Sequence, residues 1–209
     1  MALLCPTVLA ENPHSFREQL ERVEPFARRI QIDLMDGVFA PSQSVELAKI
    51  WLPDSIPVDI HLMFQNPDDY LEQLITLKPH MVIVHAESDC DVAQFAVRLN
   101  EHDIQCGVAV LPETTVASIN DILPYVQHVL IFGGKLGYFG GTADLSQLQK
   151  VAEIKSQHSE MEIGWDGGVN EHNALEIAQA GVDVINVGGF IQKSENPEQA
   201  YQQLENLVS

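Results

Sequence analysis

The chain has 209 residues, of which 45% are hydrophobic and 20% are charged. This profile is typical of a folded globular protein, and it excludes a disordered chain, a collagen-like repeat and a coiled coil. Because 30 acidic side chains stand against 11 basic ones, the net charge is −19. Such an acidic surface repels nucleic acids and anionic membranes, so we expect neither as a partner.

The cysteines and the N-terminal sequence indicate the cellular compartment of the protein. Cys5, Cys90 and Cys106 are far apart and form no CxxC pair, which is typical of a reducing environment. The apolar start of the chain follows no Lys or Arg and therefore lacks the charged region of a signal peptide. No stretch of the sequence is long and apolar enough for a membrane span. We expect a cytoplasmic protein.

Short runs rich in Val, Ile and Leu recur along the chain, and an amphipathic stretch follows each of them. Such continuous apolar runs are typical of parallel strands buried on both faces. The predicted strands are 3–9, 29–34, 58–63, 81–85, 105–110, 128–132, 162–166 and 184–187. The predicted helices are 13–23, 67–76, 91–100, 115–123, 144–157, 171–180 and 197–207, and only a short helical pattern at 45–50 lies within residues 35–51.

Eight strands alternating with helices, without a linker or a change of composition, predict one α/β domain over residues 1–209. A doubly wound open sheet alternates in the same way. The count of eight favours a closed (β/α)8 barrel, or TIM barrel, whose range begins at about 200 residues. Because functional sites of such barrels gather at the C-terminal ends of the strands, polar residues there are candidate site residues.

Four such residues follow from the strand pattern. Period two places Gln31 and Asp33 on one face of the second strand, and His61 and Asp166 lie near the ends of the third and seventh. Meeting at one barrel mouth, these carboxylates, imidazole and amide could hold a divalent metal. Two carboxylates could also remove and return a proton on opposite sides of a substrate carbon. Each Asp alone could instead cap the following loop.

Three glycine pairs lie in the second half of the chain, at Gly140 and Gly141, Gly167 and Gly168, and Gly188 and Gly189. The last two pairs follow the seventh and eighth strands, where barrels commonly bind phosphate through backbone N–H groups. Such a site needs no basic side chain, so an anionic ligand is compatible with the acidic chain. We expect Lys135, in the loop after the sixth strand, to be solvated.

Six segments, taken in order, resemble the ribulose-phosphate 3-epimerase family. They are IDLMDGVFAP at 32–41, VDIHLM at 58–63, HAE at 85–87, GVAVLPET at 107–114, YFGG at 138–141 and WDGGVN at 165–170. The resemblance spans almost the whole chain, and the combination of these motifs is specific. It implies a (β/α)8 barrel of the ribulose-phosphate-binding type, with a phosphorylated ketose as its partner.

The resemblance also implies roles for individual residues. Asp33 and Asp166 match the acid–base pair on the two faces of C3, and together with His61 they match metal ligands. The methionines beside the reacting carbon match Met35 and Met63, and the three glycine pairs match the phosphate loops. Thr7 retains a hydroxyl of the pocket, and we place His85 there as well.

The sequence departs from the family pattern at several positions. Gln31 stands where the family has a second metal-binding histidine. An amide oxygen suits zinc less well than an imidazole does, which leaves open zinc, manganese, iron, magnesium or no metal. Residues 10–12 replace a Ser-Ala-Asp element, the loop at 133–142 is longer than the family's, and Gly188-Gly189 replaces a Gly-Ser phosphate contact.

Three functions fit these residues. The first is an epimerase of a phosphorylated ketose, with a divalent metal stabilising the enediolate. The second is a lyase or decarboxylase of the orotidine-phosphate decarboxylase group, whose motif carries a Lys where this chain has Met35. The third is a non-catalytic or repurposed sugar-phosphate-binding barrel, motivated by Gln31 and Ala10. The retained Asp33, His61 and Asp166 favour the epimerase, and a homo-oligomer stays open because no interface pattern is visible.

Overall fold

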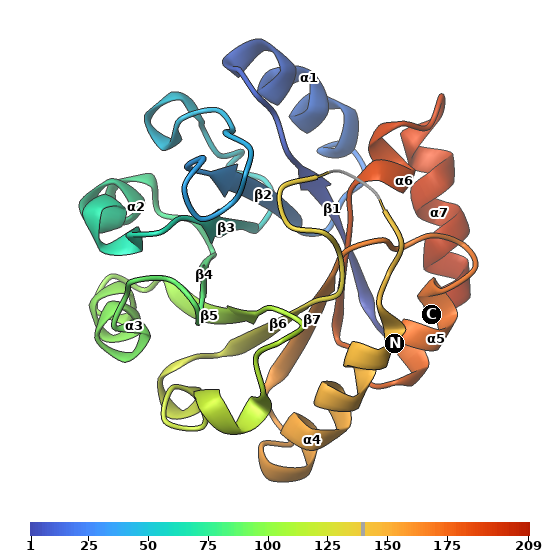
Figure 1. The fold of residues 1–209 in the computed structure, drawn as a ribbon. Coiled ribbons are helices and arrows are strands. Elements are labelled where there is room, and N and C mark those ends of the chain that lie inside the picture. The colour runs from blue at the N-terminus through green and yellow to red at the C-terminus, as the bar shows by residue number, and fades with distance from the viewer. Residues whose placement is uncertain (139–140) are drawn as a thin grey trace.

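Eight parallel strands close into a barrel in the order in which they occur along the chain. The computed structural model describes residues 1–138 and 141–209. The strands are β1 (Leu3–Val8), β2 (Ile30–Met35), β3 (Val58–Met63), β4 (Met81–His85), β5 (Gln105–Val110), β6 (His128–Phe132), β7 (Glu162–Asp166) and β8 (Val184–Val187). The helices surround them (Figure 1). The predicted (β/α)8 barrel is therefore confirmed.

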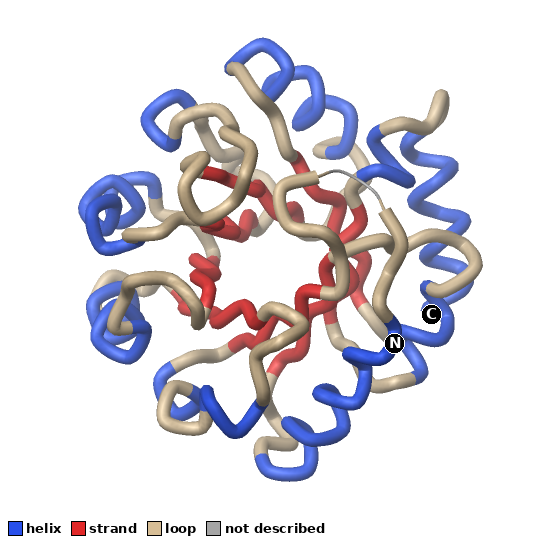
Figure 2. The backbone as a smooth tube through the Cα atoms, viewed as in Figure 1, coloured by secondary structure: helices blue, strands red, loops and turns tan. Residues whose placement is uncertain are grey.

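The outer ring contains helices of very different lengths (Figure 2). They are α1 (Pro13–Val23), α2 (Leu71–Leu77), α3 (Val92–Asn100), α4 (Gln149–Gln157), α5 (Ala174–Gln179), α6 (Gly189–Gln192) and α7 (Pro197–Val208). Short 3₁₀ segments occur at Leu47–Lys49, Pro67–Tyr70, Val116–Ile119, Leu123–Tyr125 and Leu145–Leu148. Across residues 1–138 and 141–209, none of the helices has the length and apolar character that a bilayer crossing requires.

The helix predicted over 115–123 is wrong, because this stretch forms only the 3₁₀ segments Val116–Ile119 and Leu123–Tyr125. Pro124 provides the physical reason: a proline has no N–H to donate, and its ring clashes with the carbonyl four residues earlier. The four-residue helix α6 was not predicted, since so short an element has no helical periodicity to detect.

The longer helices begin where the sequence caps them. The Asn12 side chain accepts hydrogen bonds from the backbone N–H groups of His14 and Ser15, and Pro13 occupies the first turn of α1. An Asn cap followed by Pro satisfies backbone donors and presets the helical φ angle. At the other end of the chain, the backbone N–H of Ala2 donates to the carbonyl of Val208, which places α7 beside β1 and closes the ring.

Besides a small apolar cluster of Met35, Ala40 and Met63, two separate cores stabilise the barrel. The larger one lies between the outer faces of the strands and the helices, and it contains fully buried side chains such as Phe16, Leu34 and Ile60. The smaller one lies inside the barrel on β4, β5 and β6 and consists of Met81, Ile83, Ala109 and Leu130. One side of the barrel interior is therefore apolar, whereas β2, β3 and β7 direct polar side chains into it.

A buried ionic network fills the N-terminal end of the barrel. Arg29 Nε lies 2.6 Å from Asp59 Oδ2, and an Arg29 guanidinium nitrogen lies 3.0 Å from Glu162. His80 and His128 extend the network, at 2.8 Å from Asp59 and 2.7 Å from Glu162 respectively. These contacts place one guanidinium between two carboxylates at the end of the barrel opposite the candidate site.

We expect Arg29→Met to lower the free energy of unfolding by about 3 kcal/mol, because Asp59 would stay buried without its counter-charge. Urea denaturation at pH 7 measures this loss. Arg28→Met is the matched control: Arg28 is 70% exposed beside Glu205, and such a surface pair contributes about 1 kcal/mol or less. Equal losses for the two variants would contradict the assignment of Arg29 to a buried network.

Candidate functional site

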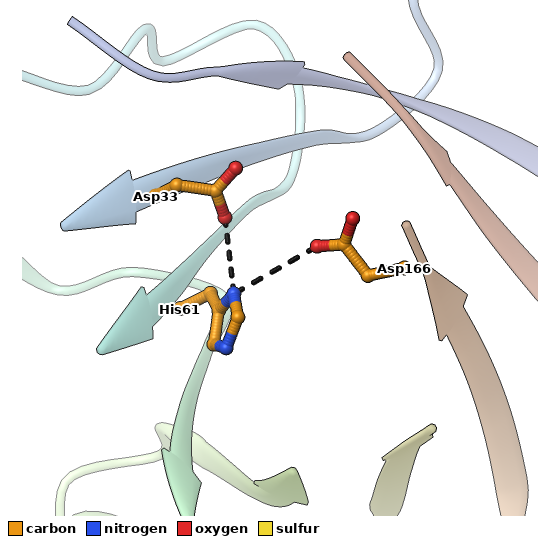
Figure 3. Close-up of side chains that lie close together, drawn as sticks. All are labelled: Asp33, His61 and Asp166. Carbon is orange, nitrogen blue, oxygen red and sulfur yellow. Dashed lines mark hydrogen bonds and ion pairs between the residues drawn. The ribbon is translucent and has the colours of Figure 1, made fainter. Parts of the chain in front are cut away.

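Three polar side chains from distant parts of the sequence meet at the C-terminal end of the barrel. Asp33 lies on β2, His61 on β3 and Asp166 on β7, and both carboxylates approach the same imidazole (Figure 3). Asp33 and His61 are register partners on neighbouring strands, so period two directs both into the barrel. One potential ligand atom from each of the three residues lies within 4.8 Å of the others.

Hydrogen bonds connect the three residues to Gln31. His61 Nδ1 lies 3.1 Å from Asp33 Oδ1 and 3.8 Å from Asp166 Oδ2. Gln31 Nε2 donates to Asp33 Oδ1 at 2.8 Å and to Asp166 Oδ2 at 2.6 Å. The Gln31 amide therefore links the two carboxylates, while its Oε1 atom is buried without a partner among the described residues.

The proximity of the two carboxylates changes their acidity. Burial, followed by the negative charge of Asp33, raises the pKa of Asp166 to about 7, although His61 and the hydrogen bond from Gln31 oppose the shift. Two carboxylates this close cannot both ionise readily without a neighbouring positive charge. At neutral pH the site therefore retains a proton or needs a cation.

The donor set fits a divalent metal. Asp33, His61 and Asp166 form a group that could hold one ion. Turning the Gln31 amide by 180° would exchange the positions of its Oε1 and Nε2 atoms and direct the unpaired Oε1 toward the carboxylates. The two orientations of the amide differ only in which of these two atoms occupies which position. Three oxygen donors and one imidazole suit manganese, iron or magnesium better than a set richer in nitrogen does.

A second imidazole lies behind the first. His85, on β4, is fully buried, and its Nε2 lies 2.9 Å from His61 Nε2. Burial lowers the pKa of His85 to about 4, against the opposing effect of Glu87. His85 is therefore neutral at physiological pH, and it contacts His61 from the side away from the carboxylates.

A cavity of about 290 Å³ opens above these groups. Among the residues predicted from the sequence, its walls contain Thr7, Asp33, His61, Met63, Gly141, Asp166, Gly167, Gly168, Gly188 and Gly189. Gln31, Met35 and His85 are buried next to this lining but are not part of it. Gly140 lies outside the described residues. The functional roles assigned to all these residues stay predictions.

Glycine is required in the loop that follows β7. Gly167 and Gly168 have φ angles of +119° and +70°, which side-chain-bearing residues rarely adopt. A Cβ atom would lie 2.2 Å from the Gly134 nitrogen if added at Gly167, and 2.3 Å from the Ala143 nitrogen if added at Gly168. The loops after β6 and β7 therefore pack backbone against backbone, and the cavity wall there consists of main chain.

Several lining residues were not identified from the sequence. Asn186 on β8 is the register partner of Asp166, so the rule for polar residues near strand ends could have selected it too. Phe132, the partner of Asp166 on β6, is apolar and falls outside that rule. Lys193 follows α6, where the sequence shows no signal. Lys135 is exposed, as expected, yet it also lines the cavity, with its Nζ 4.7 Å from the centre of the Tyr138 ring.

Comparison with known proteins agrees with this geometry. Residues 3–191 match the ribulose-phosphate 3 epimerase family. The chain is 28% identical to the ribulose-phosphate 3-epimerase of Aquifex aeolicus, over 100% of this chain and 97% of the relative. It is 31% identical to the protein of that name from Helicobacter pylori strain 26695, over 98% of this chain and 97% of the relative.

These matches define the chain as an enzyme of the isomerase class. It belongs to the ribulose-phosphate 3 epimerase family. A solved structure of 3-hexulose-6-phosphate synthase superposes with a TM-score of 0.78 at 14% identity, covering 99% of this chain and 100% of the other. At that identity, the likeness supports the fold alone.

The raised pKa of Asp166 predicts how stability depends on pH in metal-free protein. The pKa rises from 3.8 to about 7 on folding, so the contribution of this group is complete below pH 4 and is lost as the pH rises through 7. Relative to Asp166→Asn, the wild type should lose about 3 kcal/mol of unfolding free energy between pH 5 and pH 8.

Urea denaturation in the presence of a chelator measures this difference. The comparison with Asp166→Asn cancels the other titrating groups, including Glu162. Addition of Mn²⁺ should reduce the difference at pH 8, because a cation neutralises the ionised pair. A difference that stays constant from pH 5 to pH 8 would contradict the proximity of the two carboxylates.

Proposed function

We propose that the protein epimerises a phosphorylated ketose at C3, with Asp33 and Asp166 as the acid–base pair. One observation carries the proposal: two carboxylates from β2 and β7 face a single cavity beside His61 (Figure 3). Membership of the ribulose-phosphate 3 epimerase family supports the same reaction. D-Ribulose 5-phosphate is the substrate to test first, since the curated relatives carry its name.

The reaction requires one carboxylate and one carboxylic acid. The ionised group removes the C3 proton, which is acidic because C2 is a carbonyl carbon, and the electron pair forms the enediolate. The protonated group then donates its proton to the opposite face of C3. In the metal-free protein the pKa of Asp166 is raised to about 7, which is the range in which a carboxyl group can act as an acid or as a base at neutral pH. After each turnover the two states are exchanged, and solvent restores them.

A divalent metal held by Asp33, His61, Asp166 and Oε1 of Gln31 would supply positive charge that stabilises the enediolate oxygens. The neighbouring apolar group of Ile83, Ala109 and Leu130 limits water on the other side of the barrel interior and so strengthens these electrostatic interactions.

The phosphate group would bind at the opposite wall of the cavity. Gly141, Gly168, Gly188 and Gly189 line it with main chain, and backbone N–H groups bind phosphate without needing a basic side chain. Lys135 and Lys193 also reach this wall. They add positive charge locally in a chain whose net charge is −19.

Hydrogen exchange tests the reaction directly. Incubation of D-ribulose 5-phosphate with the protein in heavy water should remove the C3 proton signal from the NMR spectrum, with manganese, iron, zinc or magnesium supplied in turn. Hexulose phosphates extend the test to longer substrates. Absence of exchange with every ketose phosphate and metal, together with retained phosphate binding, would instead indicate a barrel that binds sugar phosphates without catalysis.

We expect Asp33→Asn and Asp166→Asn each to lower the epimerisation rate by about 10³-fold or more, because each removes one of two proton carriers. Each variant should still exchange the C3 proton of the one epimer that faces its remaining carboxylate, and the two variants should differ in which epimer this is. Glu113→Gln removes an exposed carboxylate and serves as the control. Loss of exchange from the same epimer in both variants would contradict a two-base mechanism.

Gln31→His should raise the affinity for zinc more than the affinity for manganese, because an imidazole replaces an amide oxygen in the donor set. Titration of chelator-treated protein with each metal measures the two affinities. Gln192→His changes a partly buried glutamine of α6, away from the carboxylates, and is the control. An equal change for both metals would contradict a place for Gln31 among the metal ligands.

A further inference from the structure

A chain of three side chains extends from the candidate metal site toward β5. His61 Nε2 lies 2.9 Å from His85 Nε2, and His85 Nδ1 lies 3.4 Å from Glu87 Oε2. Both histidines are fully buried, and the Phe39 ring packs against His85 with the ring centres 4.7 Å apart. Neither histidine can therefore exchange its partner for water without rearrangement of the barrel.

The protein holds Glu87 in one orientation. Its Oε1 accepts hydrogen bonds from the backbone N–H of Leu111, at 2.9 Å, and from the hydroxyl of Thr114. Its Oε2 faces the Nδ1 of His85 at 3.4 Å; both atoms are buried, and neither has a hydrogen-bond partner with good geometry among the described residues. An ionised carboxylate only accepts hydrogen bonds, so the proton between these two atoms belongs on His85 Nδ1.

The position of the proton on His85 determines which nitrogen of His61 donates to it. A neutral His85 with its proton on Nδ1 has a lone pair on Nε2. Since two N–H groups or two lone pairs facing each other at this distance would repel, His61 must donate from its Nε2. A neutral His61 that donates from Nε2 has its lone pair on Nδ1, the atom that faces the oxygens of Asp33 and Asp166 (Figure 3). Such a convergence of electron pairs is stable around a cation.

We propose that Glu87, acting through His85, is a positioning residue that fixes His61 in the tautomer that binds a divalent cation. The inference rests on the metal site of the proposed function and extends it to two residues outside the cavity wall. Carboxylates that hydrogen-bond to a metal-binding histidine change metal affinity by about 10–100-fold. In this chain a second imidazole transmits the effect.

Mn²⁺ binding to chelator-treated protein, measured by the electron paramagnetic resonance signal of the free ion, tests the proposal without substrate or turnover. The informative variant is Glu87→Gln, which keeps the size of the side chain. Its amide oxygen would accept from Leu111 and Thr114, so its NH₂ group would face His85 Nδ1. The chain of hydrogen bonds would reverse and place a proton on His61 Nδ1. The Kd for Mn²⁺ should rise by about 10–100-fold.

Glu87→Ala removes the carboxylate without reversing the chain, so it should raise the Kd less than Glu87→Gln does, although it leaves Thr114 and Leu111 without their acceptor. A structural role would give the opposite order. Nitrogen-15 NMR provides a second readout: the proton of His61 should lie on Nε2 in the metal-loaded wild type and on Nδ1 in Glu87→Gln. Glu113→Gln, which removes an exposed carboxylate one residue before Thr114, should change neither measurement.

Two results would overturn the proposal. Mn²⁺ affinity of Glu87→Gln equal to that of the wild type would show that His61 does not depend on Glu87, and affinity losses that follow only the loss of thermal stability would show a structural role. If the wild type binds no divalent cation, both this proposal and the metal of the proposed function fail. The C3 exchange experiment would then decide separately on the roles of Asp33 and Asp166.

Discussion

Two carboxylates that approach one buried imidazole impose a charge constraint on the C-terminal end of the barrel. Asp33 and Asp166 can lie this close only when a proton or a cation offsets their repulsion. The raised pKa of Asp166 expresses this constraint in the metal-free protein. The Gln31 amide lessens it by donating to both carboxylates, and His61 completes a group of three residues that could hold a cation.

The barrel interior has an apolar side and a polar side, and this separation confines the repulsion between the two carboxylates to the candidate site. Met81, Ile83, Ala109 and Leu130 fill the side formed by β4, β5 and β6, so little polar surface competes with the site there. At the N-terminal end, Arg29 pairs with both Asp59 and Glu162 within its own network. The barrel therefore pairs carboxylates with a guanidinium at one end, whereas at the other end Asp33 and Asp166 face a cavity that a ligand can enter.

The cavity wall also explains how a chain with a net charge of −19 can accommodate an anionic ligand. Main chain at Gly167 and Gly168 forms part of that wall, because neither position has room for a Cβ atom. Lys135 and Lys193 contribute positive charge at the rim. The acidic surface elsewhere does not interfere, since charges separated by more than about 10 Å are largely screened at physiological salt.

The sequence by itself determined the barrel and the residues that meet at its mouth. Apolar runs such as the Met-Val-Ile-Val that begins β4 at Met81 define strands, and period two predicts which side chains face inward, because both are local properties of the chain. Asp33, His61 and Asp166 could therefore be identified in advance. Pro124 shows the limit of helical patterning, since one missing N–H replaced the predicted helix by 3₁₀ segments.

Only the tertiary structure decided how those residues are connected. The amide of Gln31 lies between two carboxylates, and Glu87 is held against His85 by Leu111 and Thr114, contacts that depend on side-chain rotamers and on the packing of a distant loop. Lys193 reaches the cavity wall although nothing in its local sequence indicates this. Local patterns determine which way a side chain faces, whereas hydrogen-bond partners and loop positions depend on contacts between segments far apart in the chain.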